Sequence, residues 1–310
     1  MADLVQEFVM NKSVHSDFLI HWTGLDIDQK YDKEWWINKS KEPNRVIIPY
    51  YLERLKYILK YGLWMNEDKN YIEIAKDGNK HEIKIPLVAR TCFTELRLSE
   101  IRFHAQKFGR LGIGFKRMFV INRLGNPLLY FRPEKENWLL PPFLYGKQQD
   151  RIDELYSCFL KSMDEEQKEG NLLEYKQFDE SEWRIIYSED IEKRFIDLKR
   201  SELCDFFIRP EEIRDPEFHK YIKENDRDGK LRFLIHLKSS KFTAEILDKW
   251  VAMIIYPNIA VKVESEFDPG IRKLIEVGKP KRSDPPPKGS AGYEQFNKPI
   301  EIDLDACRNF

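Results

Sequence analysis

The chain has 310 residues, of which 42% are apolar and 13% aromatic, enough for a sizeable core and too many for a disordered chain. Its net charge of −1 argues against a protein that is basic over its whole surface. The four cysteines form no Cys-x-x-Cys motif, and the sequence shows neither a basic leader nor a long apolar run, so we expect a reduced, cytoplasmic protein without a membrane span.

Short apolar runs and turn residues predict the first elements. SDFLIHW, residues 16–22, predicts a strand, and the polar stretch DIDQKYDKEWWINKSKEPN, residues 26–44, predicts a loop. Apolar residues at three- and four-residue spacing from Leu52 to Leu59 predict a helix, which Gly62 terminates. KDGN between two alternating runs predicts a hairpin.

The stretch 88–131 combines helix and strand signals. Ser99 is a candidate N-cap for a helix that reaches Phe108 and ends at Gly109. LGIGF predicts a strand in which the glycines mark close backbone approach. KRMFVINRLGNP predicts a short helix, and LLYF predicts a buried strand.

The second half of the chain gives fewer clear signals for helices and strands. Residues 149–169 predict a polar, mostly acidic helix, and SEWRIIYS predicts a strand that opens on Glu182. Residues 231–237 and 251–257 predict two more strands, and Thr243 is a candidate helix cap. Helices and strands mix without regular βαβ alternation, which predicts an α+β fold.

A Pro-, Lys- and Gly-rich stretch, GKPKRSDPPPKGSAG, sets the expected domain boundary. It predicts a single α+β catalytic-type domain over residues 1–278, and a linker and appended tail over residues 279–310.

Most motifs that would fix a chemistry are missing. The sequence has no Walker loop, GRLGIG has the wrong spacing for a dinucleotide fingerprint, and there is no G-x-S-x-G elbow. It has no H-E-x-x-H motif, and His104 lacks a second histidine at helical spacing, so we expect no metal.

Polar residues at strand ends remain as candidates. A histidine such as His21 can bind a ribose hydroxyl, a carboxylate such as Glu182 can stabilise a cationic sugar centre, and Arg90 can hold a diphosphate through its planar fork. Each also has a structural interpretation: a hydrogen-bonded strand-end histidine, a salt bridge between Glu182 and Arg184, and an ion pair between Arg90 and Glu95.

Charge is unevenly distributed. From Arg90 to Arg132 the sequence has nine Lys or Arg and two acids, a local charge of +7, which leaves −8 for the remainder. Interleaved with aromatics, such a segment can follow a phosphate backbone, dock an acidic partner, or be only a solvated face.

Several stretches resemble the AbiGi family of bacterial abortive phage-infection proteins, whose members carry the label of antitoxin. The resemblance spans about residue 17 to the end of the chain and is densest over residues 88–131. Its stretches are FLIHWTG, ILKYGL, ARTCFTELRLSEIRFHAQKFGRLGIGF, NPLLYF, SEWRIIY, VAMIIYPN and DACRNF.

A weaker resemblance connects the chain to DarT-type ADP-ribosyltransferases, which cleave NAD and attach ADP-ribose to nucleic acid. It rests on the order of an H-x-T strand, a helix ending ILKYGL, and NPLLYF. The resemblance implies an ADP-ribosyltransferase-like β core with Glu182 as the catalytic acid beside His21, and Glu264 and Glu266 as rivals. The stacking aromatic is left open among Tyr57, Tyr61 and Tyr130. The NAD contacts it implies are His21, Trp22, Thr23, Arg90 and Tyr130.

The sequence therefore suggests a phage-defence toxin, an NAD-dependent ADP-ribosyltransferase that modifies nucleic acid. Arg110, Lys116 and Arg117 would guide the nucleic acid, and a cognate antitoxin would dock on the acidic helix or the tail. One alternative is a non-catalytic antitoxin or interaction module that binds a toxin partner. Another is a nucleic-acid-binding regulator with no need for NAD.

Overall fold

A computed structural model gives the fold, and the description below is confined to the residues that it places. These are 18–30, 41–67, 71–76, 79–84, 86–95, 101–131, 155–162, 165–167, 173–175, 181–237, 250–276 and 299–309.

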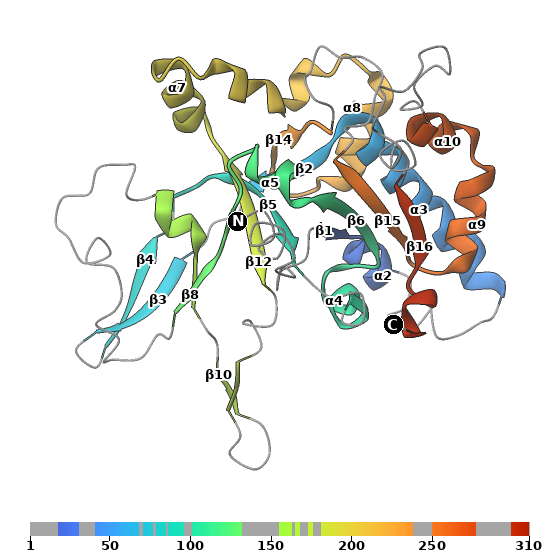
Figure 1. Ribbon diagram of the computed structural model, residues 1–310, viewed down its shortest axis with the longest axis horizontal. Coiled ribbons are helices and arrows are strands. Elements are labelled where there is room, and N and C mark those ends of the chain that lie inside the picture. Colours follow the sequence, from blue (N-terminus) through green and yellow to red (C-terminus); the bar gives the residue numbers. More distant parts are fainter. Residues whose placement is uncertain are drawn as a thin grey trace, which may run out of the picture.

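The described chain is a mixed α+β protein built on a ten-stranded sheet with flanking helices (Figure 1). The strands are β1 Phe18–Thr23, β2 Leu63–Glu67, β3 Tyr71–Lys76, β4 Asn79–Lys84, β5 Ala89–Thr94, β6 Leu111–Lys116, β7 Asn126–Pro127, β8 Leu129–Phe131, β9 Leu160–Ser162, β10 Glu165–Gln167, β11 Leu173–Tyr175, β12 Glu182–Tyr187, β13 Phe207–Ile208, β14 Leu231–Ile235, β15 Val251–Tyr256 and β16 Ile300–Asp303. The helices are α2 Leu25–Lys30, α3 Lys41–Tyr61, α4 Ile101–Phe108, α5 Arg117–Ile121, α7 Glu189–Asp197, α8 Pro216–Asn225, α9 Ile259–Phe267 and α10 Pro269–Glu276, with short 3₁₀ turns at Ser157–Phe159, Ser201–Phe206, Pro210–Glu212 and Ala306–Asn309.

The main path of the large sheet runs β13-β14-β2-β5-β1-β6-β15-β16, and β12 pairs with β5 off this path. All its pairings are antiparallel except β15 with β16. Three two-stranded sheets, β3-β4, β8-β9 and β10-β11, complete the described strands. None of the described helices is long and apolar enough to cross a bilayer.

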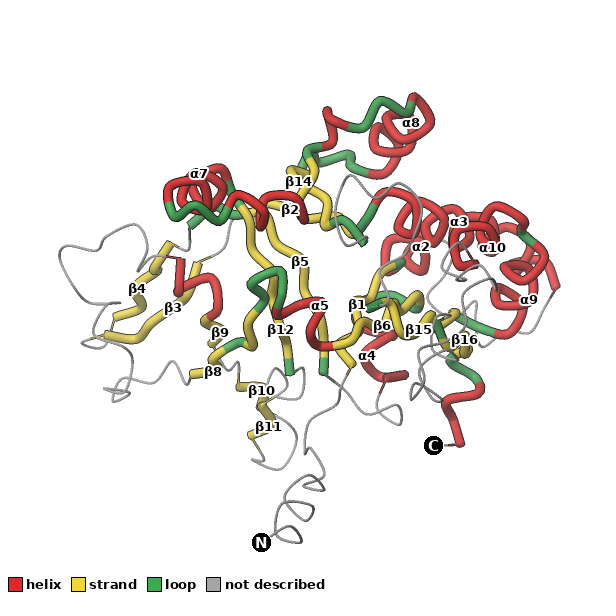
Figure 2. The backbone as a smooth tube through the Cα atoms, turned by 45° about the horizontal axis from the view of Figure 1, so that its top comes forward, coloured by secondary structure: helices red, strands yellow, loops and turns green. Residues whose placement is uncertain are grey.

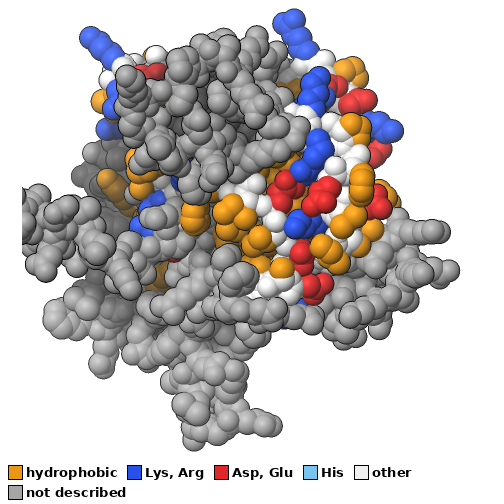
Figure 3. Space-filling model, turned by 45° about the vertical axis from the view of Figure 1, so that its right-hand side comes forward, with side chains coloured by type: hydrophobic (Ala, Val, Ile, Leu, Met, Phe, Trp, Pro, Cys, Tyr) orange, Lys and Arg blue, Asp and Glu red, His pale blue; other side chains and the backbone are white. Residues whose placement is uncertain are grey.

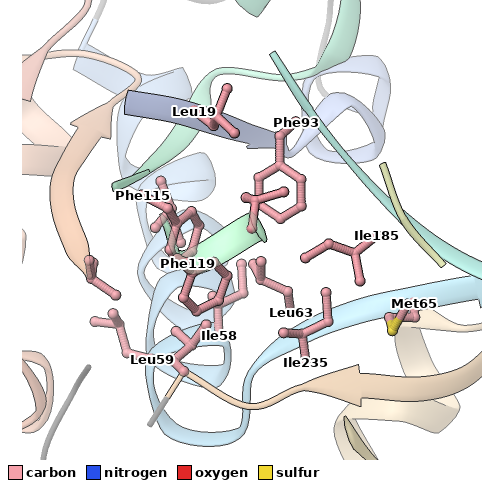
Figure 4. Packing of buried hydrophobic residues seen from close by; sticks show 14 of the residues in the cluster. Leu19, Ile58, Leu59, Leu63, Met65, Phe93, Phe115, Phe119, Ile185 and Ile235 are labelled. Atoms are coloured by element: carbon pink, nitrogen blue, oxygen red, sulfur yellow. The ribbon is translucent and has the colours of Figure 1, made fainter. Parts of the chain in front are cut away.

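Helices cover both faces of the sheet. Figure 2 shows α3, α9 and α10 grouped together, and their apolar faces pack on Leu19, Phe115 and Tyr256 in the main core. Figure 4 shows this packing around Phe93, Phe115 and Phe119. On the opposite face, α4 and the C-terminal 3₁₀ turn pack on Ile20, Trp22 and Met253.

Several predicted elements are confirmed. The first strand, the hairpin, the helix that Gly62 terminates at a φ of +121°, and the strand that opens on Glu182 are all present. The close approach predicted at LGIGF is also present, because a Cβ on Gly112 would lie 2.8 Å from the indole carbon Cζ3 of Trp22. The caps predicted at Ser99 and Thr243 lie outside the described residues.

Two predictions are wrong in the described residues. The expected loop contains α2 and the first turns of α3, which includes Pro49 in its interior. Of the acidic helix expected at 149–169, residues 155–156 are helical, but a 3₁₀ turn at Ser157–Phe159 and the strands β9 and β10 follow where a helix was expected. The expected tail contributes β16 to the large sheet, and both Leu304 and Cys307 are buried behind it. The domain division at residue 278 stays a prediction.

Candidate functional site at the split between β1 and β2

Strand β5 changes partner along one of its edges. Near its start it pairs with β2, where Asn66 lies opposite Arg90, and at its end it pairs with β1, where Ile20 lies opposite Thr94. The other edge is occupied by β12 along the whole strand. The end of β1 and the start of β2 therefore diverge beside the middle of β5.

His21 lies at this split and hydrogen-bonds the backbone there. Its Nδ1 is 2.9 Å from the carbonyl oxygen of Cys92, and because a carbonyl only accepts, Nδ1 carries the proton and Nε2 is the unprotonated nitrogen. Burial lowers the pKa of His21, and the charge of Arg54 lowers it further, against the opposing effect of the Cys92 hydrogen bond. The imidazole is therefore neutral at pH 7, with Nε2 able to accept a hydrogen bond.

Thr23, two residues further along β1, is held by a partly buried arginine. The Nη1 of Arg54 on α3 donates to Thr23 Oγ1 at 3.0 Å, its Nε donates to the Tyr221 hydroxyl at 2.7 Å, and its Nη2 bonds Asp26 Oδ2 at 2.7 Å. Asp26 is open to solvent, with 60% of its side chain exposed, whereas Arg54 is 16% exposed. These bonds fix the guanidinium beside the end of β1.

A cavity of about 1010 Å³ opens next to this group. Its walls come from α2, α3, β2 and the segment between α8 and β14, and they include Asp26, Trp64 and Asn66. The volume lies at the upper end of the range for ligand pockets. Asn66 Oδ1 has no hydrogen-bond partner within the described part of the chain. The chain Thr23–Arg54–Asp26 thus connects the end of β1 to a cavity wall.

Glu182 lies on the other face of the sheet. In antiparallel pairs, residues directly opposite share a face, so Glu182 and Ile20, both opposite Thr94, point the same way. His21 follows Ile20 and points the opposite way, toward Phe93, whose ring centroid is 5.8 Å away. The structure therefore does not bring the side chains of His21 and Glu182 together.

Both carboxylate oxygens of Glu182 are already paired. Oε1 accepts from Arg184 Nε at 2.7 Å and Oε2 accepts from Lys161 Nζ at 2.8 Å, while the backbone N–H donates to the Tyr130 hydroxyl at 3.1 Å. Arg184 also donates to the Cys158 carbonyl at 2.8 Å. These bonds attach the β8-β9 layer to the large sheet.

The charges around Glu182 decide its protonation. Burial raises the pKa of Glu182, but Arg184 and Lys161 together outweigh burial and hold it at about 2. The neighbouring Cys92 thiol has its pKa raised to about 12, first by desolvation and then by the negative charge of Glu182. At neutral pH this cluster holds a paired anion and a neutral thiol, which suits an internal ion pair better than acid–base or thiolate chemistry.

The remaining predicted NAD contacts are dispersed. Trp22 is buried in the second core against Gly112, and Arg90 is half-buried on β5, opposite both Asn66 and Ile186. Tyr130 lies on β8 beside Glu182. Neither Trp22, Arg90 nor Tyr130 lines the cavity of about 1010 Å³, and neither do His21 and Thr23.

The predicted nucleic-acid contacts are partly internal. Arg110 is buried with its Nε 3.9 Å from Asp28, and burial lowers its pKa to about 10 despite that charge. Arg117 donates to Glu95 at 2.7 Å, and Lys116 lies 5.9 Å from the ring centroid of Trp250. The charge of +7 counted in the sequence is therefore not a single open basic face.

Sequence reasoning missed Arg54, Asp26 and the cavity. Arg54 lies in a helix with an ordinary amphipathic pattern, and Asp26 lies in a stretch that had been predicted to be a loop. Only the proximity of α2, α3 and β1 reveals that they form one group. Within the described residues, no group of three or more His, Cys, Asp or Glu side chains is arranged to hold a metal.

Comparison with family models, with curated proteins and with solved structures finds no match to this chain.

Proposed function

We propose that the protein is an NAD-dependent ADP-ribosyltransferase that modifies nucleic acid as the effector of a phage-defence system, with the split between β1 and β2 as its NAD site. The observation that carries the proposal is the chain of side-chain bonds from Thr23 through Arg54 to Asp26, because Asp26 lines a cavity large enough for a dinucleotide. The resemblance to DarT-type enzymes supports the transferase assignment, and the resemblance to the AbiGi family supports a role in phage defence.

His21, Arg54 and Asp26 each have a role in the proposed reaction. Arg54 is a fixed cation for the diphosphate of NAD, and His21 Nε2 accepts a hydrogen bond from a ribose hydroxyl. As the bond between nicotinamide and ribose breaks, neutral nicotinamide leaves and positive charge develops on the ribose. Asp26 stabilises that charge, since it lines the cavity and is held by Arg54. A base nitrogen or oxygen then attacks the anomeric carbon, and its proton passes to solvent.

This assignment moves the catalytic acid from Glu182 to Asp26. Both carboxylates have both oxygens bonded, but Glu182 is buried on the opposite face between Arg184 and Lys161, whereas Asp26, bonded to Arg54, is exposed and lines the cavity. The two carboxylates now have different expected effects. Loss of the Asp26 carboxylate should reduce transfer, whereas loss of the Glu182 carboxylate should reduce only the stability of the sheet.

The test is transfer of labelled ADP-ribose from NAD to mixed DNA, RNA and protein acceptors. We expect label on nucleic acid, and a loss of about 100-fold or more in Asp26→Asn at unchanged folding. Thr23→Val keeps the shape of the side chain but removes the acceptor for Arg54, so we expect NAD binding to weaken about tenfold. Binding of NAD is measured by calorimetry.

The control variant is Lys30→Gln, because Lys30 lines the same cavity but has no part in the proposed chemistry. Transfer that persists in Asp26→Asn would rule out the assigned acid. Absence of both NAD binding and label from the wild-type protein would remove the transferase proposal altogether.

A second candidate is a non-catalytic antitoxin or interaction module. It is favoured by the complete pairing of Glu182 and by the internal contacts of Arg110 and Arg117, which leave little of the originally expected site open. Expression in cells separates the two. The transferase is expected to be toxic alone and harmless as Asp26→Asn, whereas the antitoxin is harmless alone and rescues cells from a partner toxin.

A further inference from the structure

The hydroxyl of Tyr221 on α8 carries a proton for which the described residues provide no acceptor. Its oxygen accepts a hydrogen bond from Arg54 Nε at 2.7 Å, so its own O–H has to point elsewhere. Burial raises the pKa of Tyr221 to about 12, against the charge of Arg54, so the proton is retained at neutral pH. Tyr221 is only 3% exposed, and a buried donor without an acceptor is costly unless a ligand supplies one.

Arg54 also keeps a donor that the described residues do not use. A guanidinium carries five N–H groups. Nε donates to Tyr221, Nη1 donates to Thr23 and to Asp26 Oδ1, and Nη2 donates only to Asp26 Oδ2. The second N–H of Nη2 therefore has no partner within the described part of the chain.

The planar guanidinium places these two unused donors side by side. Asp26 spans Nη1 and Nη2 at the outer end of the group, so the second N–H of Nη2 lies on the Nε side, parallel to the N–H that points at Tyr221. Two parallel N–H groups direct their acceptors to adjacent positions, as when an arginine binds both oxygens of a carboxylate. The Tyr221 oxygen fills one position. An oxygen in the other position would accept from Nη2 and from the Tyr221 O–H together.

The ring of Tyr221 is fixed by its neighbours. Tyr57 stacks on it with the ring centroids 3.9 Å apart and the planes 5° apart, and Trp64 meets it edge-on at 5.8 Å. The start of α8 is attached to α3, because Asp215 accepts from Lys60 Nζ at 2.8 Å (Figure 1). The hydroxyl is therefore held in place before any ligand arrives, which lowers the cost of binding.

The two donors lie between two hollows of the surface. Tyr221 lines a groove of about 800 Å³ between α3, α8 and α9, and Asp26 lines the cavity of about 1010 Å³. Tyr50, Glu53 and Glu224 line both, so the hollows are adjacent. Figure 3, with the side that carries α9 and α10 turned forward, shows Lys and Arg interspersed with Asp and Glu. The described surface in this view offers an anion no broad basic field, so its binding depends on specific donors.

We propose that Tyr221 is a binding residue of the NAD site, whose O–H and the second Nη2 N–H of Arg54 donate to one phosphate oxygen of the diphosphate. A phosphate oxygen accepts more than one hydrogen bond, and bonds in which donor or acceptor is charged are strong. The identity of the ligand rests on the proposed function. Tyr221 adds a second donor to the role already given to Arg54.

The experiment is calorimetry of the full chain with NAD and with ADP-ribose, which keeps the diphosphate but lacks nicotinamide. Tyr221→Phe removes the hydroxyl and keeps the stacked ring, and it is expected to weaken binding of both ligands about tenfold or more. Tyr187→Phe is the matched control, because Tyr187 is also buried and stacks on Phe207 at 3.9 Å, but lies on β12. It should bind both ligands as the wild type does. Circular dichroism establishes that each variant is folded.

Replacement of Tyr221 by 3-fluorotyrosine separates donation to the ligand from support of Arg54. Fluorine makes the phenolic O–H more acidic, so the hydroxyl becomes a better donor and a poorer acceptor. Binding should tighten if the hydroxyl donates to the ligand. Weaker binding would show that Tyr221 only accepts from Arg54, and would overturn the proposal.

Equal binding by the wild type and Tyr221→Phe, or binding of neither ligand by the wild type, would overturn it as well. Failure of the proposed function has a different signature. In that case both ligands bind and depend on Tyr221, but no ADP-ribose is transferred to any acceptor.

Discussion

Glu182→Gln is expected to lower the free energy of unfolding by about 3–5 kcal/mol, because it leaves Arg184 and Lys161 without their buried counter-charge. Urea unfolding followed by circular dichroism measures the change. The side chains of Glu182 and Arg184 are each 8% exposed, so water cannot replace the lost carboxylate.

Glu202→Gln is the matched control for this experiment. Glu202 also pairs with an arginine two residues away in sequence, Arg200, but both side chains are largely exposed, at 60% and 58%. Surface pairs of this kind contribute little, so the unfolding midpoint should stay unchanged. Equal stability of Glu182→Gln and wild type would show that the pair is not what holds the β8-β9 layer.

The same pair gives a pH dependence. The pKa of Glu182 is about 2 in the folded protein, against an ordinary value of 4.5 for a glutamate. A depressed pKa adds stability that is fully present above pH 4.5 and is lost as the pH falls toward 2, in total about 3 kcal/mol. Unfolding measured between these pH values should lose this increment in the wild type and not in Glu182→Gln.

Gly109→Ala is expected to lower the free energy of unfolding by at least about 3 kcal/mol, or to prevent folding. Gly109 ends α4 with a φ of +111°, and a Cβ there would lie 2.4 Å from the carbonyl of Thr23 and from the nitrogen of Leu25. Because these neighbours are backbone atoms, they can yield only if the end of β1 moves. Any folded fraction should therefore also lose NAD binding in calorimetry.

Gly229→Ala separates the cost of a left-handed backbone conformation from the cost of a steric clash with the added Cβ. Gly229 also has a positive φ, +61°, but a Cβ there meets nothing within 4 Å. Only the cost of the left-handed conformation remains, about 1 kcal/mol. If the two variants were equally stable, the close contact of Gly109 with β1 would not matter.

Local signals in the sequence predicted an element correctly where the apolar pattern and a turn or cap residue coincided. Gly62 and Gly109 each follow an amphipathic run, and both are helix C-caps with positive φ. KDGN sits between two alternating runs and forms the β3-β4 hairpin. In these cases the residue pattern and the backbone requirement point to the same element.

Composition predicted the wrong secondary structure where contacts within the fold decide the conformation. Acidic residues such as Glu165 and Glu166 suit a helix, yet they lie in β10, paired with β11. The polar stretch around Asp26 lacks apolar residues at helical spacing, but α2 forms there. Asp28 on α2 accepts a 2.5 Å hydrogen bond from the buried hydroxyl of Tyr51. Tyr51 is 23 residues from Asp28, and a contact at that distance leaves no local trace in the sequence.

The candidate site was predictable only in part. HWTG marked the end of β1, and this is where the sheet splits. Sequence order could not show that Glu182 and His21 point to opposite faces, because that depends on register: both Glu182 and Ile20 lie opposite Thr94. Nor could spacing reveal that Arg54, 31 residues from Thr23, donates to its hydroxyl.

The position of β1 in the sheet also has a consequence for synthesis on the ribosome. β1 is the first described strand to be made, yet the residue that Ile20 pairs with on β5 follows 74 residues later, and its other neighbour, β6, comes later still. At about 5–20 residues per second, both edges of this apolar strand stay unpaired for roughly 4–15 seconds. During that interval the nascent chain exposes a sheet template, and chaperone binding to residues 18–23 would be most useful then.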